Sequence, residues 1–132
     1  LFLSSAAHEN AHSLGFARED EANFIAYLAC ISSEDPSIRY SGAMLALINC
    51  GNALYKSSPD KAAALRETYS DAVIRDIAAY NQYWEGYEGE VEEAFDSIND
   101  SYLKFNLQEN GVKSYGMMVD LMLAYYDIQP DQ

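Results

Sequence analysis

The chain has 132 residues, a length that fits one domain built around a single hydrophobic core. Its 8 Lys and Arg stand against 21 Asp and Glu, which gives a formal net charge of −13. A chain this acidic is a poor partner for nucleic acid and for anionic membrane surfaces.

The first predicted helix carries both histidines of the chain, in the string His8-Glu9-Asn10-Ala11-His12. This is the HExxH pattern of zinc metallopeptidases. Residues four apart project from one face of a helix, so two imidazoles can share one tetrahedral zinc ion while the Glu faces the metal-bound water. We therefore expect His8 and His12 to be zinc ligands and Glu9 to be the general base.

The residues on either side set the expected limits of this helix. Ser4 and Ser5 are candidates for the N-cap, and Gly15 is a natural terminator after the motif. The helix is therefore expected to be short and to stop soon after His12. The alternative interpretation is that both histidines are ordinary residues of a helix surface.

A catalytic zinc usually takes three protein ligands and one water, so a third ligand is expected close by. No histidine remains, and the acidic run after the glycine offers Glu19, Asp20 and Glu21. On a helix, Glu19 shares a face with small or short side chains, namely Ala22, Asn23, Ala26 and Cys30. Glu21 falls on nearly the opposite face. Glu19 is therefore the preferred third ligand and Glu21 is the reserve.

Two further roles follow from the same helix. Asn23 lies one turn after Glu19 and can accept the free N–H of a ligand imidazole, as residues behind a metal site normally do. The competing interpretation of the acidic run is that Glu19, Asp20 and Glu21 are solvated residues that favour the positive end of the helix dipole.

Further helices are predicted along the rest of the chain. Asp35-Pro36 and Ser58-Pro59 each combine an N-cap with a proline at the first helical position. The helix after Asp35 carries Ile38, Met44, Leu45, Ile48 and Leu54. The segment after Ser58 carries Leu65, Tyr69, Val73, Ile77, Tyr80, Tyr83 and Trp84 at helical spacing. A segment from Glu90 carries Val91, Phe95, Ile98, Tyr102 and Phe105, and a last helix after Asn110-Gly111 carries Met117, Met118, Leu121, Met122 and Tyr125.

These periods predict an all-α fold, a bundle of about five to six helices that forms a single domain over residues 1–132, because no useful period-two segment appears. Methionine and aromatic stripes at this spacing are expected to form the core. Cys30 and Cys50 lie in apolar helical stretches and are expected to be buried free thiols. The longest apolar run, near Met117, is broken by Asp120, so no membrane span is expected in this piece.

Three strings carry a family resemblance that spans nearly the whole chain: HENAHSLGFAREDEANFIAYLAC from residue 8, IRYSG at residues 38–42 and GVKSYGMMVDLMLAYY at residues 111–126. They resemble a bacterial family of membrane-anchored proteins of unknown function that is assigned to the zincin superfamily. The string from Glu19 to Asn23 is also similar to the ExxAD-type second motif of gluzincins, with Asn23 in place of the acid. Only residues 13–18 separate His12 from Glu19, a shorter gap than many gluzincins have.

The resemblance implies a zinc peptidase that continues beyond this piece. Zincins commonly line the substrate cleft with a strand upstream of the HExxH helix, and the family implies N-terminal membrane helices. We therefore expect a fragment of a larger protein, anchored at a bacterial membrane through the missing segment, with this domain on the extracytoplasmic side. The fragment alone is expected to have doubtful activity.

A zinc peptidase also needs a group that stabilises the oxyanion formed during attack on the carbonyl. Tyr115 is the candidate, together with the pair Arg39-Tyr40, and core packing is the alternative role for any of the 11 tyrosines. The predicted activity is hydrolysis of a peptide bond in a peptide or protein substrate by a zinc-activated water, with Glu9 carrying the proton to the leaving amine.

Two other functions remain open at this point. The first is a non-catalytic helical domain that binds a partner protein and has retained or lost the zinc site. The second is a structural zinc, which would need a fourth protein ligand.

Overall fold

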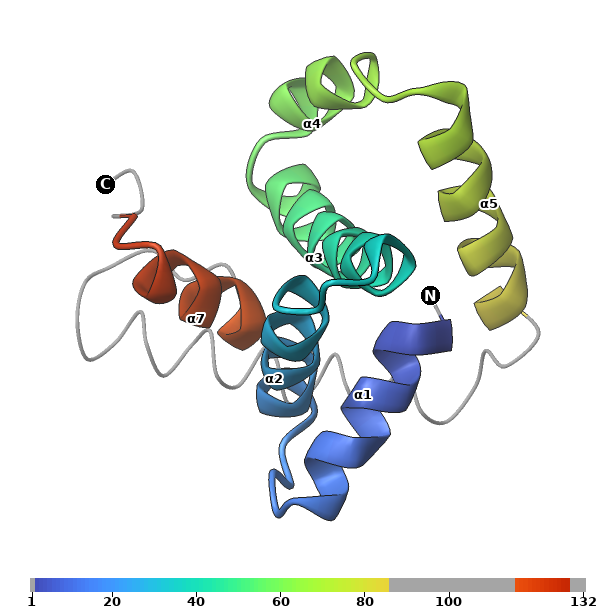
Figure 1. The fold of residues 1–132 in the computed structure, drawn as a ribbon. Coiled ribbons are helices and arrows are strands. Elements are labelled where there is room, and N and C mark those ends of the chain that lie inside the picture. Colours follow the sequence, from blue (N-terminus) through green and yellow to red (C-terminus); the bar gives the residue numbers. More distant parts are fainter. Residues whose placement is uncertain (1, 86–115, 129–132) are drawn as a thin grey trace, which may run out of the picture.

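The computed structural model describes residues 2–85 and 116–128, and within these ranges the chain forms six α-helices and no strand (Figure 1). The helices are α1 (Phe2–Ser13), α2 (Glu19–Ile31), α3 (Pro36–Ser57), α4 (Pro59–Arg66), α5 (Asp71–Glu85) and α7 (Met117–Tyr125). The all-α prediction is confirmed. The helix expected from Glu90 lies outside the described residues. No described helix combines the length and the apolar character that crossing a membrane would require.

α2 is the helix around which the N-terminal half is built. It packs against α1, α3 and α7, and Figure 1 shows α1 on one side of it and α7 on the other. The core cluster joins Tyr27 of α2, Ala46 of α3 and Met118 of α7, and apolar side chains pack around it: Phe24, Leu28, Ile31, Leu45 and Met122. Burying a side chain as large as Met118 contributes roughly 1.5–3 kcal/mol.

The expected core role of the methionine and aromatic stripes holds for some residues and not for others. Met44, Met117 and Met118 are buried, whereas Tyr83 and Tyr125 are exposed. For these two tyrosines the core prediction is wrong. Helical spacing shows that residues share a face, but it does not show whether another element covers that face.

A close approach between α2 and α3 explains the small side chains on α2. Ala22, Ala26 and Cys30 are fully buried. A Cβ atom added at Gly42 of α3 would lie 2.5 Å from the Cβ of Cys30, so no larger residue fits at position 42 without separating the helices. Cys30 is a free and buried thiol, as expected, whereas the free thiol of Cys50 is only partly buried.

The predicted N-cap at Ser4 or Ser5 is wrong, because α1 begins at Phe2 and Ser4 lies within its first turn. The N–H groups of a first turn have no acceptor within the helix. The backbone N–H of Ser4 donates to Ser41 Oγ on α3 at 2.9 Å, and Ser41 Oγ donates to Ser4 Oγ at 3.0 Å. Both serines are buried, so this pair fixes the start of α1 against α3.

The proline signals are confirmed, but one predicted segment divides in two. Asp35 caps α3 by accepting from the N–H groups of Ser37 and Ile38. The segment after Ser58, in contrast, breaks between α4 and α5. Thr68 Oγ1 donates to the carbonyl of Leu65 at 2.6 Å, and Ser70 Oγ accepts from Val73 N–H at 3.4 Å. Such local hydroxyl bonds compete with helix continuation and favour a new helix start.

Candidate metal centre

The turn between α1 and α2 brings three side chains of the two helices together. His8 and His12 lie one turn apart on α1, and Glu19 is the first residue of α2. Between them, Gly15 adopts φ +105°, and nothing lies within 4 Å of a Cβ added there. Glycine is therefore required by the left-handed backbone rather than by crowding. This turn reverses the chain and returns Glu19 to the histidine face of α1.

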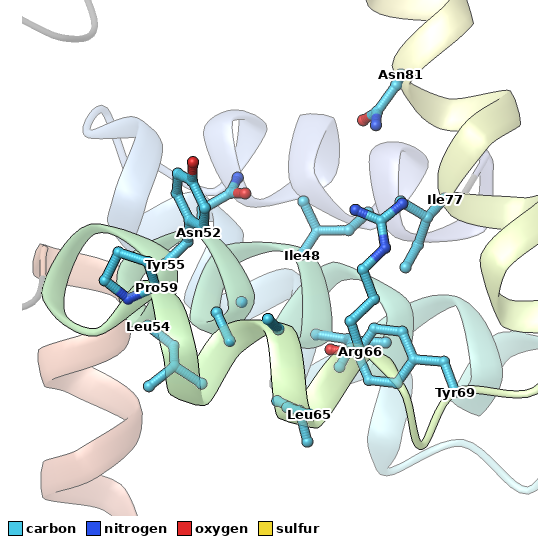
Figure 2. Close-up of a pocket in the computed structure, with 14 residues that line it drawn as sticks. Ile48, Asn52, Leu54, Tyr55, Pro59, Leu65, Arg66, Tyr69, Ile77 and Asn81 are labelled. Atoms are coloured by element: carbon cyan, nitrogen blue, oxygen red, sulfur yellow. The ribbon is translucent and has the colours of Figure 1, made fainter.

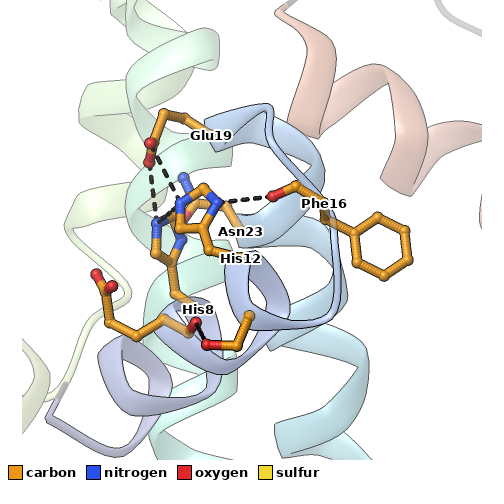
Figure 3. Close-up of polar contacts among 7 residues, drawn as sticks. His8, His12, Phe16, Glu19 and Asn23 are labelled. Atoms are coloured by element: carbon orange, nitrogen blue, oxygen red, sulfur yellow. Dashed lines mark hydrogen bonds and ion pairs between the residues drawn. The ribbon is translucent and has the colours of Figure 1, made fainter.

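The three side chains converge on one point (Figure 3). His8 Nε2 lies 2.9 Å from Glu19 Oε2, and His12 Nε2 lies 3.2 Å from Glu19 Oε1. The two Nε2 atoms are 3.0 Å apart. Ligands bound 2.0–2.1 Å from a tetrahedral zinc stand about 3.4 Å from one another. The observed triangle therefore has nearly the size that one zinc requires and would need to open by only a few tenths of an ångström.

The opposite nitrogen of each imidazole is held by an oxygen that can only accept. His8 Nδ1 lies 2.7 Å from Asn23 Oδ1, and His12 Nδ1 lies 2.7 Å from the carbonyl oxygen of Phe16. Each Nδ1 therefore carries a proton and donates, which leaves Nε2 of the neutral ring with its lone pair. With both rings neutral, two such lone pairs and a carboxylate would face one another and repel, so this donor set fits a proton or a metal cation placed among them.

The charges around His12 favour its protonated form when no metal competes. The hydrogen bond to the Phe16 carbonyl raises the pKa of His12 above its usual 6.5, and the carboxylates of Glu19 and Glu9 add to this effect. Partial desolvation opposes it and lowers the pKa. A proton and a metal ion therefore compete for the same nitrogen.

The three acids at the start of α2 have separate environments. Within the part of the chain that the structure describes, the candidate metal-binding group consists of His8, His12 and Glu19, and Glu21 does not belong to it. Asp20 accepts a hydrogen bond from the backbone N–H of Met118, near the N-terminus of α7. Burial raises the pKa of Asp20, although Arg18 and this hydrogen bond act against the rise. Asp20 thus links α2 to α7.

Glu9, the expected general base, is exposed and does not belong to the converging group. Its carboxylate is near enough to act electrostatically on His12. The backbone carbonyl of Glu9 accepts a hydrogen bond from Ser13 Oγ at 3.1 Å. The Glu9 carboxylate is therefore a solvent-exposed charge beside the converging group and not one of its members.

The other expected residues are not at this centre. Arg39 Nη1 donates to the carbonyls of Ser33 and Glu34, at 3.0 and 2.9 Å, and so braces the loop between α2 and α3. Tyr40 Oη donates to Asp76 Oδ2 of α5 at 2.6 Å. Tyr115 lies outside the described residues. The pair Arg39-Tyr40 therefore has contacts that explain it without a role beside the two histidines.

Sequence reasoning missed the Phe16 carbonyl, which holds His12. Every residue has a backbone carbonyl, so the residue type does not indicate which carbonyl will accept a hydrogen bond. The only signal was indirect, because the terminating Gly15 placed a turn where a carbonyl could point back at the helix.

Comparison with known proteins gives a family and no activity. A family described as "Protein of unknown function (DUF3810)" matches residues 2–123. No curated protein and no solved structure matches the chain. The matched region includes all of α1 and α2, and with them the converging side chains. The chain belongs to the DUF3810 family.

Proposed function

We propose that His8, His12 and Glu19 bind one zinc ion and that the protein is a zinc-dependent peptidase related to the zincins. The observation that carries this proposal is the convergence of three electron-pair donors, two of them imidazole nitrogens whose opposite nitrogens are already committed as donors. The HExxH pattern, which contains His8, Glu9 and His12, is typical of the same chemistry.

The donor set favours zinc over harder cations. Two imidazole nitrogens and one carboxylate oxygen form one of the ligand sets found in catalytic zinc sites, whereas calcium and magnesium prefer oxygen ligands throughout. Three protein ligands leave the fourth tetrahedral position for water. The Glu19 side chain is 43% exposed, so solvent has access to this position.

Each residue has a distinct task in the proposed reaction. Asn23 and the Phe16 carbonyl keep the Nε2 atoms of His8 and His12 turned toward the metal position. Zinc, when bound, would acidify a coordinated water and polarise the scissile carbonyl. Glu9 would act as the general base, which takes a proton from the attacking water and passes it to the leaving amine. Tyr115 is proposed to stabilise the oxyanion, on the basis of sequence alone.

The wider setting of the proposal comes from the family resemblance. We place the domain at a bacterial membrane, on the extracytoplasmic side, anchored through a preceding segment and acting on a peptide or protein substrate. The alternative is a non-catalytic helical domain that binds a partner protein and has retained or lost the zinc site, and measurements of zinc binding and of hydrolysis separate the two.

The first test measures zinc content and zinc affinity of the purified protein and of three variants. His12→Ala and Glu19→Ala are expected to lose the metal. Glu21→Ala removes a carboxylate from the same helical turn and is the matched control, which should bind zinc as the wild type does. A wild type without zinc, or a Glu21→Ala variant as impaired as Glu19→Ala, would refute the proposed ligand set.

The second test separates catalysis from binding. Wild type and Glu9→Gln are both made as the full-length, membrane-anchored protein and incubated with peptide libraries. Glu9→Gln should still bind zinc but should no longer hydrolyse the peptides. Zinc binding without any hydrolysis by the wild type would favour the partner-binding alternative. Equal hydrolysis by wild type and Glu9→Gln would exclude Glu9 as the base.

A further inference from the structure

A second candidate site lies apart from the metal centre, in a cavity between α3, α4 and α5 (Figure 2). Its volume is about 310 Å³, at the lower end of the range of roughly 300–1,000 Å³ that small-molecule pockets occupy. Apolar side chains form most of its wall, including Leu47, Ile48, Leu54 and Ile77. None of its lining residues belongs to α1 or α2, which carry the histidines and Glu19.

Among the described residues that line this cavity, Arg66 is the one cation, and its side chain is exposed to solvent at the edge of the apolar wall. Arg66, the last residue of α4, extends toward Ile77 of α5, and Asn81 of α5 lies at the same end of the cavity in Figure 2. Among the side chains of residues 2–83 and 116–128 no carboxylate forms an ion pair with Arg66, although acids outnumber bases 21 to 8 in the chain. A guanidinium can donate two parallel hydrogen bonds to one carboxylate, and a pair of this kind is stronger beside an apolar wall than in open water.

A glycine of α3, Gly51, also lines the cavity. Gly51 lies within α3, where glycine is unfavourable compared with alanine. A Cβ added at Gly51 would meet nothing within 4 Å, in contrast to Gly42, where the neighbouring helix leaves no room. Close packing therefore does not explain Gly51. The space in front of it is part of the cavity that Gly51 lines.

We propose that this cavity binds a small amphipathic carboxylate. The aliphatic body lies against Ile48, Ile77 and the open surface at Gly51, and the carboxylate pairs with the Arg66 guanidinium. The Asn81 amide lies at that end to donate to the second carboxylate oxygen. A neutral or cationic ligand of the same shape would gain the apolar contacts but would give the Arg66 guanidinium no anionic partner.

The test is a titration of the isotope-labelled protein with decanoate, decanol and decylammonium, followed by NMR in the presence of EDTA. The chelator makes the result independent of the metal centre and of the proposed peptidase activity. The chain carries a net charge of −13, so unspecific attraction would favour decylammonium. We expect the opposite order: saturable binding of decanoate that perturbs α3 and α4, and binding of the other two weaker by about tenfold or more.

Three variants locate the interaction. Arg66→Gln should weaken decanoate binding by about tenfold. Lys61→Gln removes the same charge from the same helix at a residue outside the cavity lining, and it should bind as the wild type does. Gly51→Leu should fill the cavity and abolish binding while the helical circular dichroism is kept. Unchanged binding by Arg66→Gln, or decanol binding as tightly as decanoate, would overturn the proposal.

A comparison of two peptide ligands shows whether the carboxylate can be supplied by the end of a peptide. A short acetylated peptide that ends in leucine is compared in its free-acid and amidated forms. Tighter binding of the free acid than of decanoate supports the same carboxylate chemistry, supplied by a peptide end. Binding of neither decanoate nor the free-acid peptide would refute the site altogether.

Discussion

Replacing Asn23 by alanine tests how the metal centre is held without touching a proposed ligand. Asn23 Oδ1 accepts from His8 Nδ1 at 2.7 Å, and this bond keeps Nε2 turned toward Glu19 and His12. The alanine variant leaves all three ligand side chains in place. It removes only the acceptor behind His8, so that the ring can rotate and exchange its tautomer.

The expected loss is a 10- to 100-fold weaker affinity for zinc, the usual effect of removing an acceptor behind a ligand histidine. This corresponds to about 1.4–2.7 kcal/mol at 25 °C. Because this hydrogen bond is 2.7 Å long and partly buried, its removal should reduce the zinc affinity more than the loss of a solvent-exposed hydrogen bond would. His12 keeps its own acceptor, the Phe16 carbonyl, so binding should weaken rather than vanish.

The assay is a competition titration of zinc against a chelator of known affinity. Asn10→Ala is the matched control, because Asn10 is an exposed amide inside the HExxH string on α1. Circular dichroism checks that the helices persist. Wild-type zinc affinity in Asn23→Ala would refute the reasoning, and so would an equal loss in Asn10→Ala.

Three more predictions follow from individual contacts. Because the pKa of His12 is raised, protonated His12 contributes to the stability of the metal-free protein below pH 6.5, and this contribution is lost as the pH rises through the raised pKa. Zinc affinity should change in the opposite sense and fall as the pH is lowered from 8 to 6, which calorimetry can follow; a pH-independent affinity would contradict the role of His12 as a ligand. Gly42→Ala should destabilise the fold by about 1–3 kcal/mol in urea titrations, because its Cβ would stand 2.5 Å from that of Cys30; Gly51→Ala is the control and should be neutral or stabilising. Gly15→Ala should cost about 1–2 kcal/mol through its left-handed backbone and also weaken zinc binding, because the turn positions Glu19; unchanged values of both quantities would contradict the role assigned to this turn.

Interactions within a few residues of one another were predictable from the sequence. The all-α class followed from the helical spacing of apolar residues, and the start of α3 followed from Asp35 and Pro36. The shared face of His8 and His12 followed from the 3.6-residue period of the helix. The end of α1 near Gly15 followed from the rarity of left-handed backbone in other residues. In each case the physical cause is local, so residue identity and spacing are sufficient.

The arrangement of the helices decided what the local pattern left open. Glu19, Asp20 and Glu21 share one helical turn, yet Glu19 faces the histidines and Asp20 accepts from Met118 of α7. Spacing ranked these acids but could not show which neighbour each would meet. Ser4 and Ser41 are hydrogen-bonded although they lie 37 positions apart, and the residues around either serine do not indicate this contact.

The positions of backbone carbonyls and of cavities likewise depend on how the helices pack. The Phe16 carbonyl that holds His12 has no side-chain signature, and the cavity beside Gly51 is lined by residues from three different helices, α3, α4 and α5. The sequence alone determined which residues could take part in a metal site and which helices would form. Only tertiary packing, which sets the distances between residues remote in the chain, decided which of those residues meet and which surfaces are left uncovered.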